Sequence, residues 1–260
     1  MALVETVRAG ATATLWLDRP NARNALSIDM CDALSAALED VDRDPDLRVL
    51  VLRGRGPVFC AGADLAAVSG AGDLEFLPAF ERMLEAMARH RLPVIAAIHG
   101  AALGGGLQLA TVCDFRIAAV DAQIGIPSSR LGILVNFENV QRLVLLAGIA
   151  AAKEVLMTGR TYSGEDAYAA GLVTRAVSED QLEAEVESLA NTIVKLSPLS
   201  IQGTKRAINT VADHLGGARS MRPDVVAQID RLVANAYNSR DLQEGVRAMA
   251  DGRDPEFRGI

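Results

Sequence analysis

Two short glycine-containing turns hold the residues of this sequence that are best suited to bind a ligand. Residues 104–106 are three consecutive glycines after the apolar run 94–98, and residues 61–63 read Ala-Gly-Ala after the β-rich stretch 51–60. The first N–H groups of a helix lack partners within it, and the helix dipole favours negative charge. Two such turns side by side could therefore hold the oxyanion of an enolate or of a tetrahedral intermediate.

The alternative for both turns is that glycine serves only the backbone angles of a tight turn. Residues 104–106 do not form a GxGxxG motif and no GK[ST] follows, which disfavours a nucleotide-binding loop. The polar residues nearby, Gln108 and Ser128, carry an amide and a hydroxyl, and neither is a general base at neutral pH without help. His90 is expected to be exposed after a helix and His99 to face packing, so no spacing indicates a Ser–His–Asp triad.

Apolar periodicity predicts the elements that position these turns. We expect strands at 11–18, 48–54 and 94–100, a strand pair at 115–126, and helices at 24–44, 72–90 and 103–114. The first helix has Ser27 as its expected N-cap, and its apolar face consists of Met30, Leu34, Ala37, Leu38 and Val41. This alternation predicts an α/β core with buried strands and right-handed crossovers.

Strand patterns fade from Asn136 onward, and helical patterns take their place. They cover 138–148, 150–159, 165–172, 179–196, 198–213, 225–237 and 240–250. Ser163 and Ser178 are expected N-caps, the latter in a capping box with Gln181. We therefore expect a helical region packed on the α/β core.

Composition excludes several classes of protein. The 260 residues carry a formal net charge of −7, which argues against nucleic acid as a partner. The first residues lack the pattern of a signal peptide, and no apolar run reaches the length of a membrane span. Cys31, Cys60 and Cys113 have neither CxxC nor metal-ligand spacing, so we expect reduced thiols in a cytoplasmic protein without a metal site. Cys60 and Cys113 stand within apolar stretches and are expected to be inert core thiols.

Five segments in order resemble the crotonase (enoyl-CoA hydratase/isomerase) superfamily along nearly the whole chain. They are DRPNARNALS (18–27), FCAGADL (59–65), PVIAAIHGAALGGGLQLATVCDFRIAA (93–119), LMTGRTYSGEDAYAAGLV (156–173) and SRDLQEGVRAMADGRDPEF (239–257). The resemblance implies a spiral of ββα units at 1–195 and a C-terminal helical trimerisation region at 196–260. It also implies a homotrimer or a hexamer built as a dimer of trimers.

The resemblance further implies a substrate and a set of binding residues. The substrate is an acyl-CoA thioester, whose carbonyl oxygen would accept from the N–H groups of Ala63 and Gly105. Its coenzyme A part would lie near Arg23, Ala61, Asp64 and Leu65, and near Phe257 and Arg258 of a neighbouring subunit. Apolar residues within 66–87 would line an acyl pocket. Coenzyme A enters as part of the substrate, and no metal or redox cofactor is expected.

The sequence departs from the hydratases where their two carboxylates stand. Gln108 replaces the acid of the helix after the glycines, and Ser128 replaces the acid that follows the proline of residues 125–132. Asn136 falls where dienoyl-CoA isomerases have a carboxylate, and Glu138 is the one acid nearby. One hypothesis is an enoyl-CoA hydratase/isomerase-like lyase or isomerase, with Glu138 or an ordered water as proton carrier. The other is a catalytically silent protein that binds fatty acyl-CoA.

Overall fold

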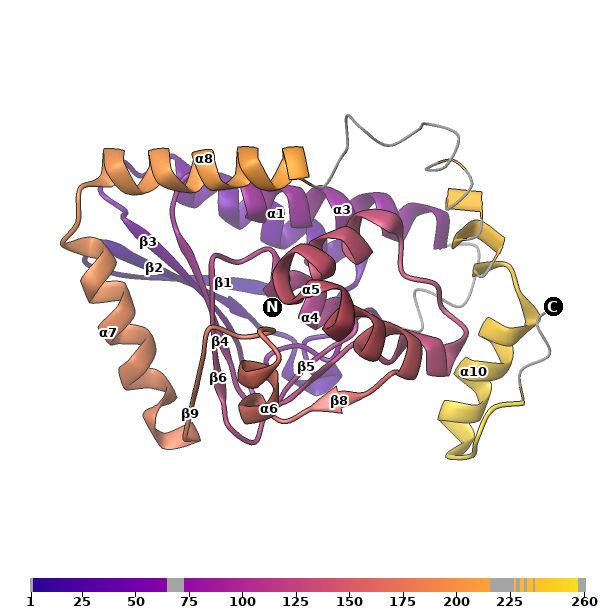
Figure 1. Ribbon diagram of the computed structural model, residues 1–260. Helices are drawn as coiled ribbons and strands as arrows, with labels where there is room; N and C mark the ends of the chain where they lie inside the picture. The colour runs from indigo at the N-terminus through magenta and orange to yellow at the C-terminus, as the bar shows by residue number, and fades with distance from the viewer. Residues whose placement is uncertain are drawn as a thin grey trace.

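A six-stranded sheet forms the centre of the protein. The computed structural model describes residues 2–64, 73–215, 227, 230, 231, 233–235 and 237–256. The order in the large sheet is β1-β2-β3-β4-β6-β9, and a three-stranded sheet has the order β5-β7-β8 (Figure 1). The strands of the large sheet are β1 (Val4–Ala9), β2 (Thr12–Leu17), β3 (Val49–Gly54), β4 (Val94–Ile98), β6 (Phe115–Ala119) and β9 (Arg175–Val177). The small sheet consists of β5 (Ala101–Leu103), β7 (Gln123–Gly125) and β8 (Thr161–Tyr162).

The parallel strands at the centre of the large sheet are buried on both faces. Only β1 and β2 pair antiparallel, and the β2–β3, β3–β4, β4–β6 and β6–β9 pairs are parallel. Alternate residues of β3 and β4 enter two separate apolar clusters, with Leu50 and Ala96 in one and Val51 and Ile95 in the other. A strand with two buried faces needs an apolar residue at every position, and β4 reads Val-Ile-Ala-Ala-Ile.

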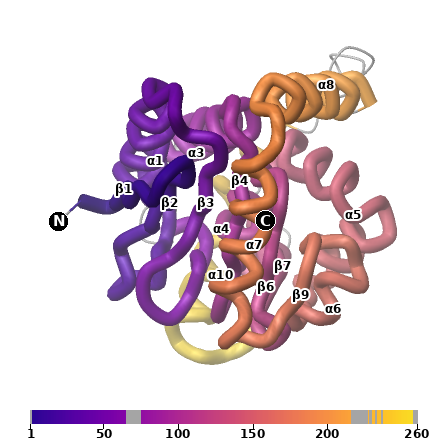
Figure 2. The backbone as a smooth tube through the Cα atoms, turned by 90° about the vertical axis from the view of Figure 1, so that its left-hand side faces the viewer, coloured from indigo at the N-terminus to yellow at the C-terminus, as the bar shows by residue number. Residues whose placement is uncertain are grey.

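Helices cover both faces of this sheet (Figure 2). The helices α1 (Ile28–Asp42) and α3 (Asp73–Arg89) pack on each other over one face, and α7 (Leu182–Val194) packs against β3, β4 and β6 on the other. The remaining longer helices are α4 (Gly105–Thr111), α5 (Phe137–Thr158), α6 (Gly164–Ala169), α8 (Pro198–Leu215) and α10 (Arg240–Asp251). Short 3-10 turns are η1 (Pro20–Ala22), η2 (Pro127–Leu131) and η3 (Glu179–Gln181). The expected α/β core with a helical C-terminal region is confirmed.

Several local predictions are confirmed. The Ser27 hydroxyl accepts from the Met30 N–H at the start of α1, and the five residues expected on its apolar face are all buried. Ser163 caps α6 in the same way through the N–H of Asp166. The two helices expected at 138–148 and 150–159 are the two parts of α5, which is broken at Gly148, where φ is 79° and ψ is 167°.

Three predictions about the elements are wrong. Ser178 precedes η3 but its hydroxyl makes no capping hydrogen bond, so the capping box with Gln181 does not form. Residues 115–126 do contain two strands, but β6 and β7 belong to different sheets and do not pair with each other. The second half of the chain also contains the short strands β8 and β9, which supply the ends of both sheets.

The small sheet brings the two glycine turns together. β5 and β7 run parallel with Leu103 opposite Gly125, and an isolated parallel bridge joins Cys60 to Ala102. The segments 60–63, 102–105 and 123–128 therefore run side by side in the same direction. In the described part of the chain, none of the helices is both long and apolar enough to span a membrane.

Candidate active site

The two glycine turns lie in van der Waals contact. A β-carbon placed on Gly105 would stand 3.3 Å from the Ala63 nitrogen, and one placed on Gly62 would stand 3.3 Å from the Gly105 nitrogen. The 61–64 turn is held from its other side by Leu26, whose N–H donates to the Gly62 carbonyl and whose carbonyl accepts from Asp64. The backbone nitrogens of Ala63 and Gly105 are therefore neighbours, and their function in binding an oxyanion stays a prediction.

Two of the three consecutive glycines occupy positions that a residue with a β-carbon cannot occupy without strain. Gly104 has φ of 53° and ψ of −120°, a conformation that residues with a β-carbon rarely adopt. Gly106 lies so close to the first turn that a β-carbon would stand 2.3 Å from the Cys60 carbonyl oxygen. Glycine at both positions lets α4 begin directly against the 60–63 segment.

The N–H groups of Ala63 and Gly105 have no acceptor within the described residues, although their neighbours do. The Gly104 N–H donates to the Gly125 carbonyl, and the Gln108 N–H donates to the Gly104 carbonyl. Gly105 is the first residue of α4, where the helix dipole favours an anion. Phe80 and Leu26 approach the same point, at 3.5 and 3.4 Å from a Gly105 β-carbon. Two N–H donors beside an apolar wall suit an oxygen that gains negative charge.

The residues expected to surround coenzyme A gather on one side of these turns. The Ala61 N–H donates to the Arg23 carbonyl at 3.0 Å, and Arg23 has a left-handed backbone with φ of 51°. Asp64 forms an ion pair with Arg19 at 2.6 Å. Leu65, Phe257 and Arg258, which were predicted to contact coenzyme A, lie outside the described residues.

Gln108 and Ser128 stand on neighbouring elements. Gln108 is in the first turn of α4 after β5, and Ser128 is in η2 after β7, the parallel neighbour of β5. Both are half-buried, and the described residues offer no hydrogen-bond partner to either side-chain polar group. No carboxylate therefore occupies either position.

Asn136 and Glu138 stand at the start of α5, and their surroundings differ. Asn136 is the N-cap of α5: its Oδ1 accepts from the Asn139 N–H at 3.3 Å, and its Nδ2 donates to Glu81 at 2.9 Å. Glu138 is exposed and lines a cavity at the C-terminal end of α4, away from the glycine turns. A catalytic function of either residue stays a prediction.

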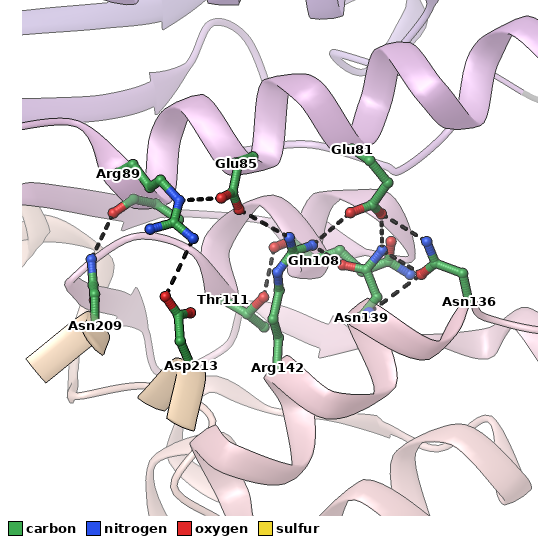
Figure 3. A network of polar contacts seen from close by, with 11 residues as sticks. Glu81, Glu85, Arg89, Gln108, Thr111, Asn136, Asn139, Arg142, Asn209 and Asp213 are labelled. Atoms are coloured by element: carbon green, nitrogen blue, oxygen red, sulfur yellow. Dashed lines mark hydrogen bonds and ion pairs between the residues drawn. The ribbon is translucent and has the colours of Figure 1, made fainter. Parts of the chain in front are cut away.

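A polar network that the sequence did not indicate joins α3 to α5 beside Asn136 (Figure 3). Glu81 of α3 accepts from Asn136, from Asn139 and from the Arg142 guanidinium, the last at 2.8 Å. Glu81 and Arg142 are 61 residues apart in sequence, so no local pattern could have predicted the pair. The only feature of the sequence that could have indicated this network is the position of the Glu81 carboxylate directly after the apolar Phe80.

The other potentially reactive side chains are buried. Burial raises the pKa of Cys60 and of Cys113 to about 12, and of Cys31 to about 12 with help from Asp32. A thiol with so high a pKa stays protonated at neutral pH and is a poor nucleophile, in agreement with the prediction for Cys60 and Cys113. His90 was expected to be exposed but is only 6% exposed, and its ring accepts from the Leu92 N–H and lies 3.8 Å from Asp42 of α1. No group of metal-ligating side chains occurs among the described residues.

Comparisons with known proteins agree with this arrangement. The sequence profile of the enoyl-CoA hydratase/isomerase family matches residues 8–259. A probable enoyl-CoA hydratase (echA8) of Mycobacterium bovis is 35% identical over 94% of this chain and 93% of its own length. A crotonyl-CoA hydratase of Syntrophomonas wolfei subsp. wolfei is 34% identical over 94% of each chain.

Solved structures share the fold over almost the whole chain. A methylmalonyl-CoA decarboxylase in complex with 2-nitronate-propionyl-CoA superposes with a TM-score of 0.89, 27% identity and 99% coverage of both chains. An enoyl-CoA hydratase/isomerase from Pseudoalteromonas atlantica T6c gives a TM-score of 0.85, with 28% identity over 98% of this chain and 100% of the other. Sequence and fold together show that this chain belongs to the enoyl-CoA hydratase/isomerase family, the crotonase superfamily.

Proposed function

We propose that this protein binds an acyl-CoA thioester and stabilises its enolate with the N–H groups of Ala63 and Gly105. The observation that carries the proposal is the contact between the two glycine turns, in which Ala63 N lies 3.3 Å from the β-carbon position of Gly105. One such donor contributes roughly 10²- to 10³-fold to the rate of reactions that pass through an oxyanion. Relatives named as hydratases and a decarboxylase of CoA thioesters support the substrate class.

The rest of the acyl-CoA would lie beside the same turns. Its coenzyme A part would contact Arg23, Ala61, Asp64 and Leu65, and in a homotrimer or hexamer it would reach Phe257 and Arg258 of a neighbouring copy. Enolate chemistry on a thioester requires neither a metal nor a redox group.

The reaction supported best is one that forms the enolate without a base. Hydration and double-bond migration require proton transfer at C2 or C3, but Gln108 and Ser128 do not ionise at neutral pH. Decarboxylation of a 2-carboxyacyl-CoA breaks the bond between C2 and its carboxylate, releases CO₂ and leaves the electron pair in the enolate, which then takes a proton at C2 from water. Uncharged residues at both positions would also tolerate the substrate's own carboxylate. The methylmalonyl-CoA decarboxylase fold match supports this choice.

A panel of substrates tests this proposal. Methylmalonyl-CoA, crotonyl-CoA, a 3-enoyl-CoA and a 2,4-dienoyl-CoA are each incubated with the protein, and products are separated by chromatography. We expect loss of CO₂ from methylmalonyl-CoA and little hydration of crotonyl-CoA. The double variant Gln108→Glu/Ser128→Glu should reverse this order, because it adds the two hydratase acids and repels a substrate carboxylate. Turnover of none of the four, with acyl-CoA still bound, would refute the enzymatic proposal.

A second candidate is a protein that binds acyl-CoA without converting it. The absence of a carboxylate at Gln108 and at Ser128 favours this candidate. Isothermal titration with butanoyl-CoA and free coenzyme A separates the two candidates when combined with the turnover panel. Binding without turnover supports the silent protein, and no heat of binding with any acyl-CoA excludes it.

A further inference from the structure

A cavity of about 960 Å³ lies at the far end of α4 from the glycine turns. Its apolar walls come from α4, α5 and α8, and include Val112, Phe137, Leu145, Leu146, Ile201 and Ile208. Ala63, Gly105 and Gln108 are not among its lining residues. The cavity is therefore separate from the candidate site, although both adjoin α4.

The order of residues along two helices places the cavity directly behind the candidate site. On α4, Gly105 stands at the turns and Thr111 at the cavity. On α3, Phe80 stands at the turns, 3.5 Å from the β-carbon position of Gly105, and Glu85 and Ala88 stand at the cavity. A rise of about 1.5 Å per residue makes the separation along α4 about 9 Å. An acyl chain that grows inward from a thioester at Gly105 would run toward this cavity.

A polar bridge between α3 and α5 lies between the glycine turns and the cavity in the order of residues along α3. The Arg142 guanidinium donates to Glu81 at 2.8 Å and lies 3.7 Å from Glu85, one turn further along α3. Arg142 also donates to the Asn139 Oδ1 at 2.9 Å. Figure 3 shows Glu81 and Glu85 of α3 facing Arg142 of α5. Arg142 and Glu85 line the cavity, whereas Glu81 and Asn139 do not, and Glu81 directly follows Phe80, which approaches Gly105, so the bridge stands at the edge of the cavity on the side of the glycine turns.

An apolar chain cannot replace this bridge. The side chains of Glu81 and Arg142 are only 24% and 21% exposed, so a chain that separated them would leave two charges poorly hydrated. Glu81 accepts hydrogen bonds from three side chains, and charge-assisted bonds of this kind are strong and directional. The bridge would therefore stop an acyl chain that runs from the glycine turns toward the cavity, at a fixed distance from the thioester.

We propose that the Glu81–Arg142 bridge closes the inner end of the acyl site, so that the protein accepts short acyl groups and excludes medium and long chains. Glu81 and Arg142 are thus specificity-determining residues. The inference rests on the proposed acyl-CoA function and adds the substrate class: short-chain acyl-CoA.

Chain-length profiles of binding test this inference. Dissociation constants for butanoyl-, octanoyl- and dodecanoyl-CoA are measured by isothermal titration for the wild type and for Arg142→Ala. This variant removes the wall but leaves Glu81 bonded to Asn136 and Asn139. Each buried methylene group favours binding about fourfold. We expect the wild type to prefer butanoyl-CoA, and the dodecanoyl-to-butanoyl affinity ratio to rise at least tenfold in Arg142→Ala.

Three further variants sharpen the result. Glu81→Ala/Arg142→Ala should raise the dodecanoyl-to-butanoyl affinity ratio further than Arg142→Ala alone. Adding Gln141→Trp to this double variant fills the cavity beyond the bridge and should return the ratio to the wild-type value. Arg43→Ala breaks an exposed ion pair with Asp40 on α1 and should leave the profile unchanged.

If the profile of both bridge variants equals that of the wild type while butanoyl-CoA still binds, the inference is wrong. It is also wrong if the wild type already binds dodecanoyl-CoA more tightly than butanoyl-CoA. Failure of every form to bind any acyl-CoA would instead overturn the proposed function.

Discussion

Gly106 has no room for a methyl group, and this restriction keeps the two glycine turns together. A β-carbon at Gly106 would stand 2.3 Å from the Cys60 carbonyl oxygen and 2.9 Å from the Cys60 β-carbon, and Cys60 directly precedes the first turn. A substitution there must move one turn away from the other. The position therefore couples backbone packing to the proposed oxyanion site.

We expect Gly106→Ala to lose both binding and stability. Overpacking of this kind costs about 1–3 kcal/mol of folding free energy, and we expect at least a tenfold weaker affinity for acyl-CoA by isothermal titration. Gly203→Ala is the matched control, because a β-carbon at Gly203 meets nothing within 4 Å. It should keep the affinity and gain about 0.5–1 kcal/mol in a helix. Equal affinity of Gly106→Ala and the wild type would contradict the coupling.

His90 makes the stability of the fold depend on pH. Burial lowers the pKa of His90, and the positive charges of Lys205 and Arg91 act in the same direction, while Asp42 opposes them. The Leu92 N–H donates to His90 Nδ1 at 3.2 Å, which requires the neutral ring. An unfolded histidine has a pKa of about 6.5. The stabilisation is therefore complete above that pH and is lost as the pH falls through the lower folded pKa.

Urea denaturation at pH 7.5, 6.5 and 5.5 measures this effect. We compare the wild type with His90→Asn, whose amide oxygen can accept from Leu92 but does not titrate. The advantage of the wild type should shrink as the pH falls. A difference in the free energy of unfolding that stays constant over this range would show that His90 does not titrate as described.

At the scale of elements, a partly buried ion pair holds α8 against the start of β4. The Lys205 ammonium lies 2.7 Å from Asp114 Oδ2 and donates to the Leu92 carbonyl at 2.9 Å. Asp114 also accepts from the Val94 N–H at 2.7 Å. The Lys205 side chain is only 7% exposed, so the Asp114 carboxylate, rather than water, is the main partner of its ammonium.

Removing Asp114 should therefore destabilise the fold more than removing Lys205. Asp114→Ala leaves a buried charge and an unpaired Val94 N–H, and should cost about 2–4 kcal/mol, since Asp114 itself is partly exposed. Lys205→Met keeps the volume and leaves Asp114 its bond to Val94, so it should cost less. Chemical denaturation of both variants measures the difference. A larger loss in Lys205→Met would contradict this account of α8.

Elements with long periodic patterns could be predicted from sequence, and short or non-local ones could not. The apolar face of α1 repeats over 15 residues, and its cap lies within the same segment. The strand β9 has three residues, too few for a period, and becomes a strand only because β6 offers an open edge. The glycine turns could be located through family resemblance, but the Glu81–Arg142 bridge depends on how α3 and α5 cross, which no local pattern encodes.

At the scale of the whole molecule, α8 presents an apolar stripe to solvent. Val211 and Leu215, which do not line the cavity, are 57% and 70% exposed and lie one helical turn apart on the same face. Figure 1 shows α8 along one margin of the molecule, with one side uncovered. Contiguous exposed apolar surface of this kind marks an interface, because leaving it in water is unfavourable.

We expect this stripe to be buried between copies of the chain in a homotrimer or a hexamer. Sedimentation of the wild type at micromolar concentration should give three or six times the 27.5 kDa of the chain. Val211→Asp/Leu215→Asp should yield smaller species, because two buried charges in each copy would oppose assembly. Tyr168→Asp, on the exposed face of α6, is the control and should keep the wild-type mass. A monomeric wild type, or a double variant that assembles like it, would show that the α8 stripe does not mediate assembly.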